Sequence, residues 1–176
     1  MRFLVILFVF PLCVFSQKMF VDNAQVSFFS SAPLEDISAL SNQLDGVVDI
    51  ATGDFFFRIP INTFVFPSSL MQKHFNEKYM ESEKYSMSFF KGSFVEPVAI
   101  LDDGFMNISA PGVLNIHGVD QDVIIDTNLS MKNGTILFYS EFNVPLKDYK
   151  IKIPKIVRMN IADTILVKVS GALVVK

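Results

Sequence analysis

Two histidines are the only imidazole groups in the chain, and they are the first residues to consider for chemistry. His74 precedes Glu77 by three positions, so in a helix the two side chains would share one face. Such a pair could hold a metal ion, but more often it only orients the histidine. His117 lies beside Gly118, where we expect a strand to end. The nucleophile turn of serine hydrolases and the spacing of zinc motifs are both missing, so the residues give catalysis little support, and we expect no metal and no cofactor.

The first residues, Met1–Ser16, have the pattern of a cleaved signal peptide. Arg2 supplies the positive charge, and Phe3–Phe15 is an apolar stretch too short to cross a bilayer. The only cysteine, Cys13, lies inside this segment. We therefore predict a periplasmic protein of residues 17–176 with no disulfide, no thiol nucleophile and no stable membrane span.

The composition favours an apolar interior and argues against nucleic acid as a partner. The formal net charge is −3 and the pI is near 5.3, and lysines alternate with acids instead of forming a basic stripe. The chain has 19 phenylalanines and no tryptophan. So many aromatic side chains suit either a well-filled barrel or a lined cavity, and the composition does not separate the two.

Most of the chain has the alternation and turn signals of antiparallel strands. In Phe55–Ile61 every second residue is apolar, which places Phe55, Phe57, Ile59 and Ile61 on one face. Asp45-Gly46 and Asn133-Gly134 are hairpin signals, and Pro111-Gly112 suggests a turn or bulge. Further strands are expected at Gln25–Ser30, Val47–Ala51, Phe94–Leu101, Phe105–Ala110, Val113–His117, Val123–Leu129, Thr135–Val144, Asp148–Ile153 and Thr164–Val175.

One helix interrupts this series, at about Ser69–Glu81. Ser68 or Ser69 can cap its start, because a serine hydroxyl satisfies an N–H that the helix leaves free. Leu34–Leu44 fits either a helical turn or a strand with Ile37 and Ala39 inward. Many short strands with a single helix predict an all-β domain, an antiparallel sandwich or up-and-down barrel.

Three stretches resemble the YceI-like family, particularly members of the Bacteroidetes type. The first is Leu70–Met80, followed by Lys84-Tyr85 and Phe89–Gly92; the others are Gly112–Val119 and Phe142–Pro154. The resemblance covers essentially the whole of residues 17–176. The resemblance implies a lipocalin-like antiparallel β-barrel of about eight strands. It also implies an exported, non-enzymatic protein that holds an isoprenoid or other amphiphilic lipid in the barrel. The oligomeric state is left open, with a homodimer as one alternative.

The expected ligand-binding residues follow from the strand faces. Phe55, Phe57, Ile59 and Ile61 should line the interior, and Phe64, Phe89, Phe138 and Phe142 should extend that lining. His74 is the candidate polar group at the mouth, since an imidazole can hydrogen-bond a head group. The alternatives are a His74 that only caps the connection, a barrel with a filled core and no ligand, and a hydrolase or isomerase that uses His74.

Overall fold

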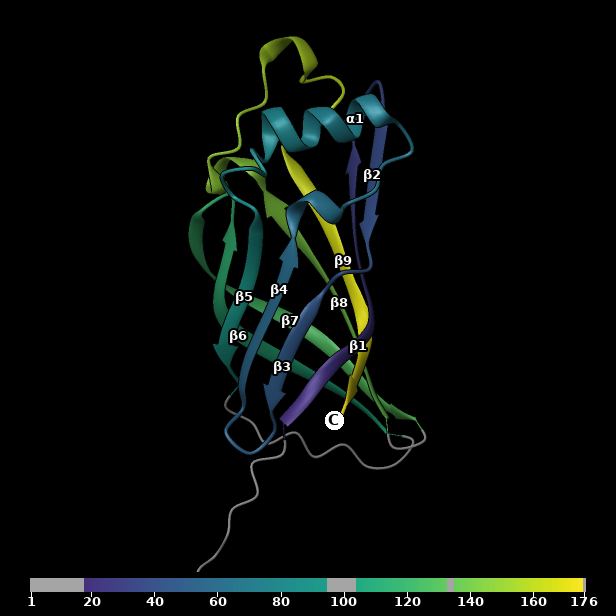
Figure 1. The fold of residues 1–176 in the computed structure, drawn as a ribbon, viewed down its shortest axis with the longest axis vertical. Helices are drawn as coiled ribbons and strands as arrows, with labels where there is room; N and C mark the ends of the chain where they lie inside the picture. The colour runs from purple at the N-terminus through teal and green to yellow at the C-terminus, as the bar shows by residue number, and fades with distance from the viewer. Residues whose placement is uncertain (1–17, 95–103, 133–134, 176) are drawn as a thin grey trace, which may run out of the picture.

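The computed structural model describes residues 18–94, 104–132 and 135–175, and these form a single antiparallel sheet curled into a barrel (Figure 1). The predicted signal peptide, most of the predicted strand Phe94–Leu101 and the predicted hairpin turn at Asn133-Gly134 lie outside the described residues. The strands are β1 (Lys18–Ser31), β2 (Asp36–Ser41), β3 (Asp45–Asp49), β4 (Asp54–Pro60), β5 (Met87–Ser93), β6 (Phe105–Ile116), β7 (Val119–Lys132), β8 (Thr135–Pro145) and β9 (Thr164–Val174).

The sheet closes because β1 has neighbours on both sides. Its first residues pair with β3, its second half pairs with β2, and β9 pairs along most of its other edge. Because β2 and β3 pair with successive parts of the same edge of β1, the two together count as one strand of the barrel. From β3 to β9 each strand pairs with the next in the sequence. The result is an eight-stranded, up-and-down barrel, and it confirms the predicted lipocalin-like fold class.

Several sequence predictions are settled by the strand register. Leu34–Leu44 contains a strand, β2, with Ile37 and Ala39 turned inward, and not a helical turn. The predicted break at Pro111-Gly112 is wrong, because β6 runs through it without interruption. The β5 ladder stops at Gly112, so Pro111 pairs with β7 alone. A proline is tolerated where one edge of a strand is unpaired.

The predicted strand at Asp148–Ile153 is also wrong. Its first residues belong to the short 3-10 helix η3 (Leu146–Tyr149), and the chain leaves that helix through Lys150, which has a left-handed backbone with φ of 57°. The apolar spacing that suggested a strand is nevertheless used, since Tyr149 and Ile151 are both buried. From here the chain continues to another 3-10 helix, η4 (Lys155–Val157), before β9 begins.

A helix covers one end of the barrel, as Figure 1 shows. It consists of α1 (Ser69–His74), continued by the π-helix η2 (Phe75–Tyr79). Ser68 is the N-cap, and its hydroxyl accepts a hydrogen bond from the Met71 N–H at 3.4 Å. We call the α1–η2 segment, η3, η4 and the β6–β7 turn the cap. No helix in the described residues is long and apolar enough to cross a membrane.

Candidate ligand-binding cavity

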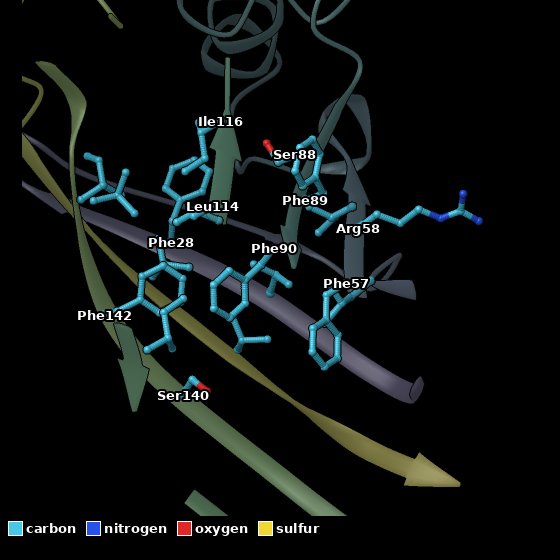
Figure 2. A pocket seen from close by; sticks show the side chains of 18 of the residues that line it. Phe28, Phe57, Arg58, Ser88, Phe89, Phe90, Leu114, Ile116, Ser140 and Phe142 are labelled. Carbon is cyan, nitrogen blue, oxygen red and sulfur yellow. The ribbon is translucent and has the colours of Figure 1, made fainter. Parts of the chain in front are cut away.

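An apolar cavity of about 300 Å³ occupies the interior of the barrel. Residues from each of the nine strands line it, and the cap contributes Phe75, Tyr79 and Met80. The lining extends from Phe55, next to the β3–β4 turn, to the cap. Figure 2 shows the rings of Phe57, Phe90 and Phe142 together within this space. An interior of this kind excludes ions and favours an apolar guest.

Most of the predicted lining residues are in place. In β4 the inward positions are Phe55, Phe57 and Ile59, and Ile61 and Phe64 continue the wall beyond the strand. From β8, Phe138 and Phe142 border the same space. The outward position between Phe57 and Ile59 belongs to Arg58, which extends away from the cavity in Figure 2. Its guanidinium forms an ion pair with Asp45 at 2.9 Å.

Phe89 differs from the prediction in the direction it faces. It touches the cavity wall, but the inward position of β5 belongs to its neighbour Phe90, which pairs with Phe57. Phe89 instead pairs with Arg58, and its ring stacks on Phe56 with centroids 6.2 Å apart. The alternation was therefore counted from the wrong residue in this strand, because two adjacent phenylalanines give no sign of which one is buried.

The structure does not bring His74 to the cavity. Its side chain is half-buried in α1 and is not among the described residues that line the interior. The next residue, Phe75, fills that place. Its ring lies 5.5 Å from Phe28 of β1 and 5.0 Å from Phe66, measured between centroids. Aromatic packing, not a polar group, joins the helix to the barrel, and a role for His74 at the mouth stays a prediction.

Few polar atoms face the cavity, and one of them has no partner. Ser30 accepts a hydrogen bond from the Ala162 N–H, and Ser140 shares one with Thr127 at 2.8 Å. Ser88 is 7% exposed, and its hydroxyl has no hydrogen-bond partner among the described residues. Because an unpaired buried hydroxyl is unfavourable, this position suits a polar group carried by a ligand. Tyr79 also borders the space, and burial raises the pKa of its phenol.

The other histidine, His117, lies outside the cavity, in a polar cluster of the cap. Its Nε2 is 2.9 Å from the Glu81 carboxylate, and its Nδ1 is 3.2 Å from the Tyr149 carbonyl oxygen. Both partners can only accept, so both bonds form together when the imidazole carries two protons. The ring of Tyr85 packs on it at 4.5 Å. His117 thus ties the end of the helical cap to η3 and to the β6–β7 turn.

Nothing in this cluster resembles a catalytic or metal site. His117 has one carboxylate neighbour and no nucleophile in hydrogen-bond contact with it. Within the described ranges, no group of three His, Cys, Asp or Glu side chains could hold a metal ion. The cavity is therefore the feature with the clearest chemical use, and that use is to enclose an apolar molecule.

The family of the chain follows from comparison with known domains. The model of the YceI-like domain matches residues 21–173, which is nearly all of the barrel. The chain belongs to the YceI-like family. A search of curated protein sequences found no significant match.

Several solved structures share the fold of this chain. A polyisoprenoid-binding domain from Saccharophagus degradans, implicated in plant cell wall breakdown, superimposes with a TM-score of 0.79 at 14% identity. The alignment covers 92% of this chain and 99% of that one. BcnA of Burkholderia cenocepacia gives 0.72 at 14% identity, with 86% and 98% covered, and the Campylobacter jejuni YCEI protein gives 0.60 at 17%, with 77% and 82% covered. At these identities the likeness shows the shared barrel.

Sequence reasoning missed several residues of this YceI-like cavity. Phe28 and Ser30 were within reach, because the alternation in Gln25–Ser30 places them on one face with Val26. Ser88 and Phe90 could be identified only by knowing which alternate residues of β5 face inward. Further missed lining residues come from the helix and from loops, where no period of two applies, namely Phe66, Phe75, Tyr79, Met80, Ile153 and Ile161.

Proposed function

We propose that this YceI-like protein is an exported carrier that holds one isoprenoid or other amphiphilic lipid inside its barrel, and that it is a binding protein and not an enzyme. The observation that carries the proposal is the continuous apolar cavity. Its volume, about 300 Å³, is at the lower end of small-molecule sites in proteins, which begin at roughly that size. An eight-stranded barrel has room for one small ligand. The polyisoprenoid-binding neighbour from Saccharophagus degradans supports an isoprenoid as the guest.

The cavity also favours a lipid over the filled-core alternative. A barrel that served only as a structural element would be expected to fill its interior with side chains, since unfilled apolar space lowers stability. Here eleven phenylalanines border the space without closing it. A chain of methyl and methylene groups would restore the missing dispersion contacts without introducing an unpaired polar atom.

The test is to reduce the cavity without disturbing the outer surface. Ala110 is buried and lines the cavity, whereas Ser109 beside it faces outward and donates a hydrogen bond to Asp126. Ala110→Leu should lower the amount of lipid that organic extraction and mass spectrometry recover from the purified protein. Ser109→Leu is the matched control and should leave the lipid content unchanged. Equal lipid content in the two variants, or none in the wild type, would contradict the proposal.

Ser88 is the residue that we expect to recognise the polar part of the lipid. Its unpaired hydroxyl can donate to an ether, ester or carbonyl oxygen or accept from an alcohol. Ser88→Ala should weaken binding of a lipid alcohol by roughly tenfold, the worth of one buried hydrogen bond, and should leave binding of the corresponding hydrocarbon unchanged. A competition titration with the two lipids would measure this difference.

Export and a periplasmic location are part of the proposal and rest on the signal-peptide pattern of Met1–Ser16. Mass spectrometry of the protein from a periplasmic fraction should give a chain that begins at Gln17. A chain that still began at Met1 would refute cleavage.

A further inference from the structure

The segment between η3 and β9 is unusually basic for this protein. Residues 150–159 have the sequence KIKIPKIVRM, with four cations, and no acid occurs from Tyr149 to Ala162. The whole chain, by contrast, has a net charge of −3. Among the described residues, the ion pairs involve Arg58, His117 and Lys168, and none involves the four cations of this segment. Their charges are therefore available to an outside partner.

The same segment carries exposed aliphatic side chains. Ile156 is 89% exposed and Met159 is 51% exposed. Leu34, in the β1–β2 connection, is 69% exposed, and its N–H donates to the Met159 carbonyl oxygen at 2.9 Å. A second tie joins the two elements, since the Asn160 side chain donates to the Glu35 carboxylate at 3.3 Å. Three large apolar side chains thus lie on two loops that are held together.

These loops lie at the outermost part of the cap end. In Figure 1 the segment rises past α1 and places η4 beyond the helix, with the β1–β2 connection beside the other end of α1. Ile153 and Ile161, which flank the exposed part, both line the cavity. The segment therefore leaves the barrel from the cavity wall and returns to it. We call residues 150–159 together with Leu34 the basic tip.

We propose that the basic tip docks on the surface of an anionic phospholipid bilayer. Ile156, Met159 and Leu34 would enter the boundary between head groups and acyl chains, where exposed aliphatic groups leave water. Lys155 and Arg158, on the same short loop, would lie among the anionic head groups, which attract nearby basic side chains. Two acids, Glu35 and Asp36, lie in or next to the β1–β2 connection, and Glu35 already accepts the Asn160 bond.

The shape of the basic tip distinguishes a bilayer from a protein partner. A partner protein is usually held by a packed apolar centre with a complementary surface. Here the apolar side chains are on a protruding loop and a hairpin connection, with cations between and beside them in the sequence. A fluid lipid surface accepts such separated side chains without a matching pocket. The inference requires no ligand in the barrel, so it can fail or hold independently of the proposed lipid carriage.

The chain offers a direct test, because it contains no tryptophan. Ile156→Trp introduces a single fluorophore at the basic tip. Phe105→Trp is the matched control, since Phe105 is also 89% exposed but begins β6, at the end of that strand opposite the β6–β7 turn of the cap. The protein is purified after processing, with its N-terminus checked by mass spectrometry. It is then titrated with vesicles of phosphatidylcholine, with and without phosphatidylglycerol.

We expect the fluorescence of Trp introduced by I156W to shift to shorter wavelength with vesicles that contain phosphatidylglycerol, and that of F105W to stay unchanged. No shift for I156W, an equal shift with phosphatidylcholine alone, or an equal shift for F105W would overturn the inference. An equal response to an acidic soluble protein in place of vesicles would also overturn it, in favour of a protein partner.

Co-sedimentation of tryptophan-free variants with the same vesicles separates the two contributions. The double variant Lys155→Ser, Arg158→Ser should bind roughly 30-fold more weakly, from the usual worth of two cations near an anionic surface. Ile156→Ser with Met159→Ser should lose roughly tenfold or more. Lys132→Ser with Phe105→Ser, at the opposite end, should keep wild-type binding. All the substituted residues are exposed, so the circular dichroism spectra of the variants should match that of the wild type. If the opposite-end variant lost as much binding as the tip variants, the proposed docking site would be contradicted.

Discussion

The barrel wall and the cap are held together in different ways. In the wall, each strand contributes inward apolar residues at every second position, and the interior polar atoms are mainly serine and threonine hydroxyls. The cap consists of short helices and loops. Part of it packs on the wall in an apolar cluster, and a few specific contacts add to that packing. Phe75 packs on Phe28 and Phe66, and His117 bonds to Glu81 and to the Tyr149 carbonyl.

This difference sets how each region responds to substitution. The wall distributes its stability over many similar contacts, so a change of size at one position is partly absorbed, but a charge there has no partner. The cap has less of this distributed packing and also uses individual hydrogen bonds between residues far apart in the sequence, such as His117 with Glu81. Loss of one such bond should loosen the cap while the barrel stays folded.

The largest effect is expected from a charge in the wall. Phe57→Asp places a carboxylate in the apolar cavity, and we expect it to cost more than about 3 kcal/mol and to abolish folding or lipid retention. Phe56→Asp is the control. Phe56 faces outward, and its cross-strand partner is Lys91, which could pair with the new carboxylate. We expect it to change the free energy of unfolding by less than about 1 kcal/mol.

Urea unfolding followed by circular dichroism measures both variants. A well-folded Phe57→Asp protein with its full lipid content would show that the inner and outer faces of β4 are reversed. It would also mean that a charge is tolerated equally on the inner and outer faces of the barrel wall.

An intermediate effect is expected from the cap. His117 has φ of 54°, a conformation in which Asn is well tolerated, so His117→Asn removes both bonds with little added backbone strain. We expect the variant to lose about 1–3 kcal/mol, because two hydrogen bonds and the packing on Tyr85 disappear. Glu81→Gln should lose less, about 0–1 kcal/mol, since Glu81 is half exposed.

Hydrogen exchange shows whether the loss is local to the cap. Amides of the α1–η2 segment should exchange faster in His117→Asn, while amides of β7 and β8 keep their protection. A uniform loss of protection across the barrel would mean that cap and wall unfold as one unit.

The same contrast explains what the sequence could predict. Alternation gave the inward faces of β4 and β8 correctly, because the period of two depends only on neighbouring residues. It failed for Phe89, where two adjacent phenylalanines leave the phase open, and at Asp148–Ile153, where apolar spacing belongs to η3 and a coil. The partners of His117 come from 36 and 32 residues away, and no local pattern identifies them.

The helix start offers a smaller test of the cap. The sequence allowed Ser68 or Ser69 as the N-cap, and the structure shows that Ser68 accepts from the Met71 N–H. Ser68→Ala should destabilise the protein by about 0.5–1 kcal/mol. Ser69→Ala, at the first helical position, should be neutral or slightly stabilising because alanine is the better helix former. Urea midpoints compare the two variants, and equal midpoints would show that the long 3.4 Å bond contributes nothing measurable.

The smallest effect is expected from the phenol of Tyr149, the buried tyrosine whose backbone carbonyl contacts His117. It should appear only in alkaline solution. Burial, and then the charge of Asp148, raise the pKa of its phenol from 10.0 to about 12. Since the folded-state pKa is the higher one, the stabilising contribution is complete below about pH 10 and is lost as the pH rises through about 12.

Over that window the free energy of unfolding should fall by at most about 1.4 kcal/mol per pH unit on account of this group. Tyr149→Phe should remove that part of the slope while changing stability little near neutral pH, where the phenol is protonated in both states. Tyr79→Phe is the comparison, because burial raises the pKa of Tyr79 too and its removal should leave the Tyr149 part of the slope intact. Urea unfolding at several alkaline pH values, with tyrosinate absorbance recorded in parallel, would measure both slopes. An unchanged slope in Tyr149→Phe would mean that the phenol ionises without disturbing the cap, and that the cap is held by the His117 contact at the Tyr149 backbone alone.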